Sequence, residues 1–362
     1  SWDKAAIGYN GYGIVTVHRD EWLQRMPITF KSFGDYKAAV AVYMDAISTT
    51  LFGINVFAIR FPMAFAGVVT VGATYVIALE LFKRRFLASV AALLVAVSPW
   101  NIQFSRIAFE SGIGVAFTSV MLACLLVARR KQWLYIPAAL SAVLAMYSYH
   151  STKIVVPLLV LWYVWQYREE AKKTMKWIGI SSVIAVVLLF PLAKETLFGM
   201  AGERYYMTSA FLNETRQFKP LHVIVPQLTS NFFAHLNPSF LIFGETTTLR
   251  HGTGKVGVLT YIEFTFLVVA LVFMVKTKNQ TARWLCGAVL IGLLPAIISN
   301  DVPHSNRAHG VIPFLQLLIA WGIFESYVVL KKMLLQQYFI SVLSVVFLIQ
   351  TIFYTYVYIS TY

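Results

Sequence analysis

The sequence predicts an all-α polytopic membrane protein with large loops on one side of the bilayer. Of its 362 residues, 58% are hydrophobic and only 13% are charged. The mean hydropathy is +0.67, well above that of ordinary water-soluble domains, which could not bury so much apolar surface. Long apolar stretches, separated by short polar segments, recur from about residue 60 to the end of the chain. Together these features indicate a bundle of transmembrane helices.

A helix that crosses the roughly 30 Å hydrocarbon core needs about 20 mainly apolar residues. Ten stretches of the chain meet or approach this requirement, and several of them are short. The segment 38–53 is less apolar and carries Asp45, so we expect it to lie at the membrane interface. No repeat or soluble segment divides the chain, which predicts a single domain over residues 1–362. The expected spans are 61–82, 86–100, 112–128, 133–149, 154–167, 177–193, 260–275, 284–299, 310–330 and 339–361.

The loops between these spans alternate between two kinds. One kind is short and basic, as at Lys83-Arg84-Arg85 and Arg129-Arg130-Lys131, and the positive-inside rule assigns such loops to the cytoplasm. The other kind should then face outward, and includes two long outer loops, 1–60 and 194–259. This orientation requires a further helix before Ser1, so we expect an N-terminal segment to be missing. The remaining outward loops are 101–111, 150–153 and 300–309.

The charge and cysteine content exclude two other classes of function. The net charge of +14 comes from short basic clusters between apolar spans, which favours membrane orientation over binding to nucleic acid. Cys124 and Cys286 both lie within apolar spans, so neither a disulfide framework nor a cysteine metal site is indicated.

Polar chemistry is concentrated in the outward loops. All seven histidines and 12 of the 16 carboxylates fall in these loops or at their edges. Long loops collect polar residues by default, but the short outward loops are enriched as well. Long loops in compact proteins are often functional, so we expect the functional site on this face.

Three short outward motifs carry the candidate binding residues. Arg106 and Glu110 are four residues apart, a spacing that would place them on one helical face. His150 and Lys153 form a second motif, and His304 and Arg307 form a third. Each could instead be an ion pair or an interfacial cation. Arginine and lysine converging at a membrane surface are suited to a phosphate headgroup, so a lipid-linked phosphate is the favoured ligand.

Five motifs, taken in order, resemble those of bacterial family 39 glycosyltransferases. These enzymes are relatives of the dolichyl-phosphate-mannose protein mannosyltransferases and of the lipid A aminoarabinose transferase. The motifs are Trp2-Asp3-Lys4 with Ser32-Phe33-Gly34-Asp35-Tyr36-Lys37, then Phe104-Ser105-Arg106 with Glu110, then Tyr149-His150-Ser151, then Phe243-Gly244-Glu245 with Arg250-His251, and finally Pro303-His304 with Arg307.

The resemblance implies the type C glycosyltransferase fold and an inverting transfer of sugar. The donor would be a polyprenyl-phosphate sugar, the acceptor a hydroxyl of a protein, lipid or glycan, and the location a bacterial inner membrane with the active site facing outward. Asp3 would be the general base and Glu110 the acid of the second loop. The expected substrate-binding residues are Tyr36, Lys37, Arg106, His150, Lys153, Arg250, His251, His304 and Arg307.

The chain departs from the family at two positions. Lys4 stands where the family usually has Glu, which removes a carboxylate beside the expected base, and Ala38-Ala39 replaces Pro-Pro after Lys37. Some relatives bind a divalent cation near the first loop. No residue spacing in this sequence identifies a metal site, and no cofactor is assigned.

Two alternatives from other functional classes stay open. One is a transporter or flippase of lipid-linked sugars, and the other is an inactive relative that only binds lipid. Transporters tend to carry charges near the membrane midplane, whereas the spans of this chain are nearly free of charge. The one-sided chemistry therefore favours an enzyme.

Overall fold

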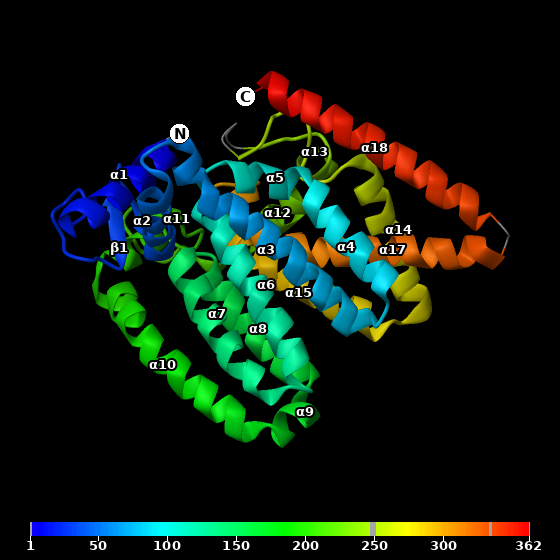
Figure 1. Cartoon of the computed structure of the whole chain (residues 1–362), viewed down its shortest axis with the longest axis horizontal. Helices are drawn as coiled ribbons and strands as arrows, with labels where there is room; N and C mark the ends of the chain where they lie inside the picture. Colours follow the sequence, from blue (N-terminus) through cyan, green and yellow to red (C-terminus); the bar gives the residue numbers. More distant parts are fainter. Residues whose placement is uncertain (1, 247–250, 333–334, 362) are drawn as a thin grey trace.

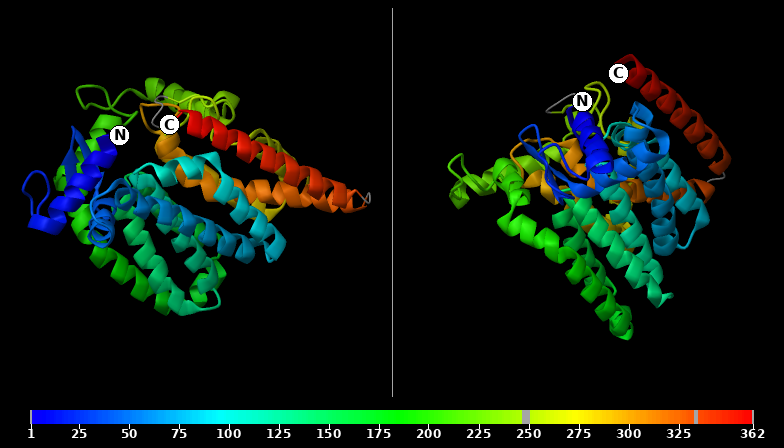
Figure 2. Two further views of the ribbon diagram at one scale, coloured as in Figure 1. Left: turned by 45° about the horizontal axis from the view of Figure 1, so that its top comes forward. Right: turned by 60° about the vertical axis from the view of Figure 1, so that its left-hand side comes forward.

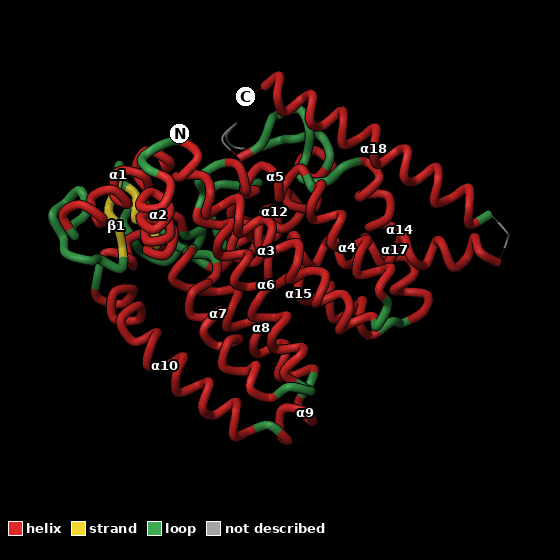
Figure 3. The backbone as a smooth tube through the Cα atoms, in the orientation of Figure 1, coloured by secondary structure: helices red, strands yellow, loops and turns green. Residues whose placement is uncertain are grey.

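The chain folds into a bundle of helices, with one short β-hairpin near its start (Figure 1). The computed structural model describes residues 2–246, 251–332 and 335–361, with the side chains of residues 2, 3 and 332 excepted. Figure 3 shows that long helices make up most of these residues. The principal elements are α1 (Trp2–Val17), β1 (Thr29–Ser32), β2 (Asp35–Ala38), α2 (Ala39–Phe52), α3 (Val56–Phe82), α4 (Arg85–Val97), α5 (Pro99–Arg106), α6 (Glu110–Ala128), α7 (Tyr135–Ser148), α8 (Thr152–Gln166), α9 (Arg168–Lys173), α10 (Met175–Phe198), α11 (Glu203–Thr208), α12 (Leu221–Leu236), α13 (Pro238–Leu241), α14 (Tyr261–Thr277), α15 (Gln280–Ile297), α16 (Ser305–Ala308), α17 (Ile312–Lys332) and α18 (Gln336–Thr361).

Each of the ten predicted spans is helical, although residues 86–100 are divided between α4 and α5. Six helices among the described residues are long and apolar enough to cross a membrane, namely α3, α6, α10, α15, α17 with the residues just before it, and α18. The other four predicted spans fall in the shorter helices α4, α7, α8 and α14. The chain is thus a multi-pass membrane protein, while the number of ten spans stays a prediction.

The predicted span 86–100 is interrupted at a proline, Pro99. Residues 86–100 were expected to form a single helix, but α4 ends at Val97 and α5 begins at Pro99, with a bend of 52° between them. Pro99 disfavours helical backbone at Ser98 and is well suited to the first position of a new helix. The Ser98 side chain then accepts a hydrogen bond from the Asn101 N–H at 3.5 Å, which caps α5.

Helices α10 and α18 lie on the outside of the bundle, along opposite flanks (Figures 1 and 2). In the 18-residue apolar stretch of each helix, only 11% of the residues are buried within the protein. Val186 and Phe190 on α10, and Ile352 and Tyr356 on α18, are all more than half exposed. Apolar surface of this extent is expected where a helix faces lipid.

The first predicted outer loop, 1–60, is a folded unit. It contains helix α1, the hairpin β1–β2, helix α2 and the start of α3. The predicted helical class is confirmed, and this short hairpin is its one addition among the described residues. The turn residues Phe33 and Gly34 both have positive φ, at 49° and 77°, as the tightest hairpin turns require. Phe30 pairs with Lys37 across the strands and is fully buried.

The hairpin determines which side chains reach the interior. Because side chains alternate between the two faces of a strand, Asp35 and Lys37 lie on one face of β2 and Tyr36 on the other. Lys37 is buried, whereas Tyr36 is half-buried. A separate apolar cluster, which includes Ile7 and Phe30, packs this unit against α3 and α6.

Helix α1 packs closely on α2 around a buried carboxyl group. A side chain at Gly11 would place its Cβ 2.5 Å from Oδ2 of Asp45, so any larger residue would require Asp45 to move. Asp45 is fully buried, and neither of its carboxyl oxygens has a hydrogen-bond partner among the described residues. Burial raises the pKa of Asp45 to about 7, because the charged form loses its hydration.

The second predicted outer loop, 194–259, also contains helices. It includes the end of α10, followed by α11, α12 and α13. Asn231 on α12 donates to the carbonyl groups of Ile297 and Ser299 at 2.7 and 3.0 Å, which attaches this region to the end of α15.

The opposite end of the bundle carries a compact ion cluster. Glu80, near the end of α3, is buried and pairs with Lys83 at 2.6 Å and with Arg130. Arg129 lies over the Tyr167 ring at 4.3 Å. Lys83, Arg129 and Arg130 belong to the basic loops that the sequence assigns to the cytoplasm.

We predict that Asp45 makes the protein less stable as the pH rises. Its carboxyl pKa is about 7 in the folded protein and about 4 in an unfolded chain, so the folded state binds the proton more tightly. The stability is therefore fully present below pH 4 and is lost as the pH rises through 7. Asp45→Asn should remove this loss, measured as thermal unfolding in detergent at pH 5 and pH 8. If the two proteins show the same change in melting temperature between these pH values, then Asp45 is not protonated in the folded state.

Candidate functional site

The polar residues of the site line a small cavity of about 160 Å³ beside α1. Its lining includes two carboxylates, Asp35 and Glu110, and two cations, Lys37 and Arg204. Glu110 is the first residue of α6 and is buried. The remaining lining residues are Ile7, Ala108, Phe109, Tyr149, His251, His304 and Asn306.

A much larger cavity of about 870 Å³ lies next to it. Four cationic side chains line this cavity against a single carboxylate, Glu203. It also has an apolar side, where Leu197 and Phe198 at the end of α10 are 73% and 86% exposed. The cationic residues are Lys153, Arg204, Arg216 and Arg307.

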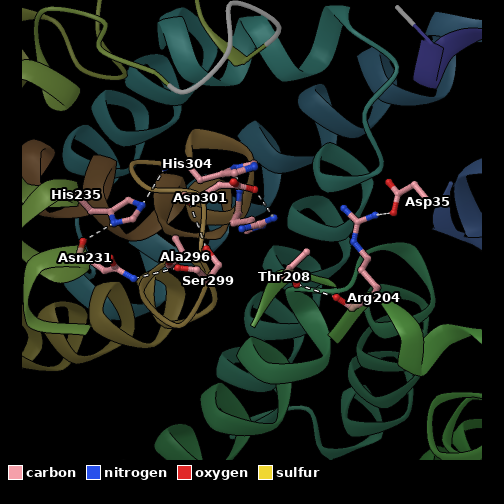
Figure 4. A network of polar contacts seen from close by, with 10 residues as sticks. Asp35, Arg204, Thr208, Asn231, His235, Ala296, Ser299, Asp301 and His304 are labelled. Atoms are coloured by element: carbon pink, nitrogen blue, oxygen red, sulfur yellow. Dashed lines mark hydrogen bonds and ion pairs between the residues drawn. The ribbon is translucent and has the colours of Figure 1, made fainter. Parts of the chain in front are cut away.

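Arg204 and Tyr149 line both cavities and so connect them. The Arg204 guanidinium forms an ion pair with the Asp35 carboxylate, and Figure 4 shows the two side chains directed at each other. Burial lowers the pKa of Arg204, but the nearby Asp35 and Tyr149 more than offset this effect, so its pKa lies above the ordinary value. Arg204 is therefore a permanent cation where the two cavities meet.

His150 is oriented by the backbone of the hairpin. Its Nε2 lies 2.8 Å from the Tyr36 carbonyl oxygen, which can only accept, so Nε2 carries the proton. Burial, and then the charges of Arg204, Lys153 and Lys37, hold the pKa of His150 well below its usual range. The ring is thus a neutral member of the large cavity.

A chain of hydrogen bonds orients His304 (Figure 4). His235 Nδ1 donates to the Asn231 carbonyl oxygen at 2.8 Å, so the neutral ring has a free lone pair on Nε2. That atom accepts from the backbone N–H of His304 at 3.1 Å. His304 Nδ1 in turn accepts from the backbone N–H of Arg307 at 3.3 Å. The rings of His304 and His251 lie 4.5 Å apart, centre to centre.

His304 is also neutral. Burial lowers its pKa to about 2, and the charges of Arg307, His251 and Arg204 contribute in the same direction. The positive charge of the large cavity therefore comes from arginine and lysine, and the neutral rings of His150 and His304 act as hydrogen-bonding groups.

The structure brings most of the predicted binding residues to these two cavities. Lys37, Glu110, His251 and His304 line the small cavity. His150, Lys153 and Arg307 line the large one. Lys153 donates to Thr196 Oγ1 at 3.3 Å, and Arg307 pairs with Asp301 at 3.2 Å. Tyr36 lines neither cavity and contributes through its carbonyl group.

The predicted pairing of Arg106 with Glu110 on one helical face is wrong. Arg106 is the last residue of α5 and Glu110 the first of α6, and the extended backbone at Ile107 and Phe109 separates the two helices. Arg106 is exposed, and its guanidinium lies 4.8 Å from the centre of the Tyr358 ring.

Two predicted residues cannot be placed fully. Asp3 belongs to α1, but its side chain lies outside what the structure describes, and Arg250 lies wholly outside the described residues. Position 3 is one turn before Ile7, so the two positions share a face of α1. Ile7 lines the small cavity.

A divalent cation near the first loop was left open by the sequence. Within the described ranges, no group of three or more His, Cys, Asp or Glu side chains is arranged to hold a metal ion.

Sequence reasoning missed three central residues. Arg204 lies in a long loop without a recognisable motif, and the ion pair joins it to Asp35, which is 169 positions away. Asp35 and Tyr149 lie within motifs that had been noted, but neither was selected. Their positions next to Lys37 and His150 were the available signal.

The sequence matches one family model. The model describes dolichyl-phosphate-mannose-protein mannosyltransferases and covers residues 36–193. This range includes Lys37, Glu110, Tyr149, His150 and Lys153 of the two cavities. No curated protein sequence matches the chain.

Solved structures show the same fold. The crystal structure of ArnT from Cupriavidus metallidurans in the apo state matches with a TM-score of 0.58 and 12% identity, over 89% of this chain and 55% of that one. This chain has the type C glycosyltransferase fold. The oligosaccharyltransferase of Archaeoglobus fulgidus, in complex with Zn and sulfate, also matches. Its TM-score is 0.56 and its identity 16%, over 97% of this chain and 48% of that one.

Two further structures hold a lipid phosphate. ArnT from Cupriavidus metallidurans bound to undecaprenyl phosphate matches with a TM-score of 0.54 and 12% identity, over 89% of this chain and 55% of that one. The second is the archaeal oligosaccharyltransferase AglB from Archaeoglobus fulgidus, in complex with an inhibitory peptide and a dolichol-phosphate. It matches with a TM-score of 0.51 and 16% identity, over 98% of this chain and 51% of that one. The chain spans about half the length of the structures it matches.

Proposed function

We propose that the chain transfers a sugar from a polyprenyl-phosphate donor to an acceptor hydroxyl, with inversion, at the outer face of a bacterial cell membrane. The observation that carries this proposal is the pair of adjoining cavities. The larger cavity combines an apolar side with an excess of cations, and the smaller one is lined by two carboxylates, two cations and two imidazoles.

The large cavity suits the lipid phosphate of the donor. Leu197 and Phe198 offer apolar contacts beside α10. Arg204 and Arg307 supply fixed positive charge for the phosphate, which becomes the leaving group when the sugar departs. Lys153 is a further cation of this cavity, and burial lowers its pKa to about 8. Cations held where negative charge develops stabilise the transition state in this way.

The small cavity suits the acceptor hydroxyl. An inverting transfer needs a base that takes the hydroxyl proton while the oxygen attacks the anomeric carbon. We propose Asp3 as this base, because position 3 lies on α1 one turn from Ile7, which lines the cavity. Glu110 is the second carboxylate that we assign to the reaction.

The proposed orientation predicts that residue 217 is outside the membrane and residue 172 inside. Gln217→Cys should react with a membrane-impermeant thiol reagent on intact spheroplasts, and Lys172→Cys should react only after the membrane is opened. The unmodified protein, with only Cys124 and Cys286 in its helices, provides the background. Equal labelling of the two variants in intact spheroplasts would contradict the orientation.

Removing one cation from the large cavity should weaken donor binding. Arg307→Ala deletes a charge-assisted contact worth about 1.5–3 kcal/mol, so the affinity for undecaprenyl phosphate should fall about tenfold or more. Its partner Asp301 is 63% exposed and would remain hydrated. Binding of undecaprenyl phosphate to the purified protein in detergent would be measured. Arg283→Ala, near the start of α15 and outside the lining of the large cavity, is the control. Unchanged affinity in Arg307→Ala would exclude this role.

Replacing the proposed base should stop turnover without preventing donor binding. Asp3→Asn keeps the size of the side chain but loses the charge, so turnover should fall by about 10²–10⁴. Without turnover, the unused lipid-linked sugar should accumulate in a deletion strain. Mass spectrometry would quantify it after the strain is complemented with each variant. Glu214→Gln, a change of an exposed carboxylate, should restore the wild-type level. If Asp3→Asn also restores it, Asp3 is not the base, and Glu110→Gln then tests the next candidate.

A further inference from the structure

A second group of cations lies beside α1. Lys4 is on α1, Arg60 is near the start of α3, and Arg106 ends α5. The three residues are far apart in the sequence, and none of them lines either cavity. We refer to Lys4, Arg60 and Arg106 as the outer basic cluster.

Close helix packing brings the members of this cluster together. A Cβ atom at Gly8 of α1 would lie 2.7 Å from Cδ1 of Ile59, the neighbour of Arg60. Gly67 of α3 packs directly against the side chain of Ser105, the neighbour of Arg106. Burial, and then the charges of Arg60 and Arg106, lower the pKa of Lys4. The three charges therefore lie within Coulomb range of one another.

Among the described side chains, no carboxylate lies within ion-pair distance of Lys4, Arg60 or Arg106. The Nε of Arg60 is buried and has no hydrogen-bond acceptor within that part of the chain. By contrast, Arg204, Arg216 and Arg307 each have a carboxylate partner. Like charges held together in this way favour an anion as their ligand.

Arg106 is also held in a suitable orientation. Its guanidinium lies over the ring of Tyr358 near the end of α18, at 4.8 Å from the ring centre. Figures 1 and 2 show the N-terminus of α1 and the C-terminal end of α18 close to each other at this edge of the molecule. A guanidinium stacked on a ring keeps its in-plane N–H donors for a planar or tetrahedral anion.

The geometry points to a second anion-binding site in the outer basic cluster, which holds a phosphate group of the acceptor while the acceptor hydroxyl enters the small cavity. Lys4 is only three positions before Ile7, which lines that cavity. This inference rests on the proposed function and adds that the acceptor is anionic. An anion bound here would sit beside α1, which carries position 3.

Competition and ternary binding test the proposal. Purified protein in an uncharged detergent is saturated with undecaprenyl phosphate and then titrated with glucose 6-phosphate, which carries both a phosphate and acceptor hydroxyls, or with glucose. Glucose 6-phosphate should bind without displacing the lipid, and glucose should not bind. The triple variant Lys4→Gln/Arg60→Gln/Arg106→Gln should bind glucose 6-phosphate at least tenfold more weakly than the wild type. The affinity for undecaprenyl phosphate should not change.

A matched variant controls for loss of net charge. Lys131→Gln/Lys173→Gln/Lys176→Gln removes three exposed lysines at the other end of the bundle and should bind glucose 6-phosphate like the wild type. If the triple variant of the cluster does not fold, the exposed Arg106→Gln alone should still lower the affinity severalfold.

Three results would overturn the proposal. Wild-type affinity in the cluster variants would do so, as would displacement of undecaprenyl phosphate by glucose 6-phosphate, which indicates a single site. Binding of short-chain phosphatidic acid without binding of glucose 6-phosphate would identify a lipid headgroup site instead. Failure of undecaprenyl phosphate to bind would contradict the proposed function alone, because the cluster can be titrated without it.

Discussion

The ion pair between Arg204 and Asp35 is the interaction on which the site depends. It joins β2 to α11 across 169 positions of the chain and lies where the two cavities meet. The Arg204 and Asp35 side chains are 22% and 36% exposed, so the pair is partly desolvated and its attraction is stronger than that of a fully exposed pair. Asp35 therefore holds the cation of Arg204 between the two cavities.

The hairpin makes this arrangement possible with very few residues. Its two-residue turn sets the register, and strand alternation then places Asp35 and Lys37 on the face toward the small cavity. The residue between them, Tyr36, is directed elsewhere, but its carbonyl group orients His150. Three consecutive residues thus supply an anion, a hydrogen-bond acceptor and a cation to different parts of one site.

Fixed charges and neutral polar groups have separate parts in the site. Burial keeps His150 and His304 neutral despite their proximity to arginine and lysine. Their protons are then positioned by backbone groups, as the chain through His235 and Asn231 illustrates. The phosphate-binding charge we propose comes mainly from arginine side chains, which stay ionised, and His150 and His304 add direction without adding charge.

The sequence by itself determined the membrane class, the helical nature of each span and the concentration of polar groups at the ends of the helices. These properties follow from local composition, because a segment in lipid must be apolar and must satisfy its own backbone hydrogen bonds. The four-residue spacing of Arg106 and Glu110 predicted a shared helical face, but extended residues between them interrupt the helix. Only the tertiary structure decided that Arg204 meets Asp35, that Arg106 joins Lys4 and Arg60, and that Asp45 is buried under α1. Such contacts arise from the packing of distant helices and the charges that this packing encloses, and no local pattern in the chain encodes them.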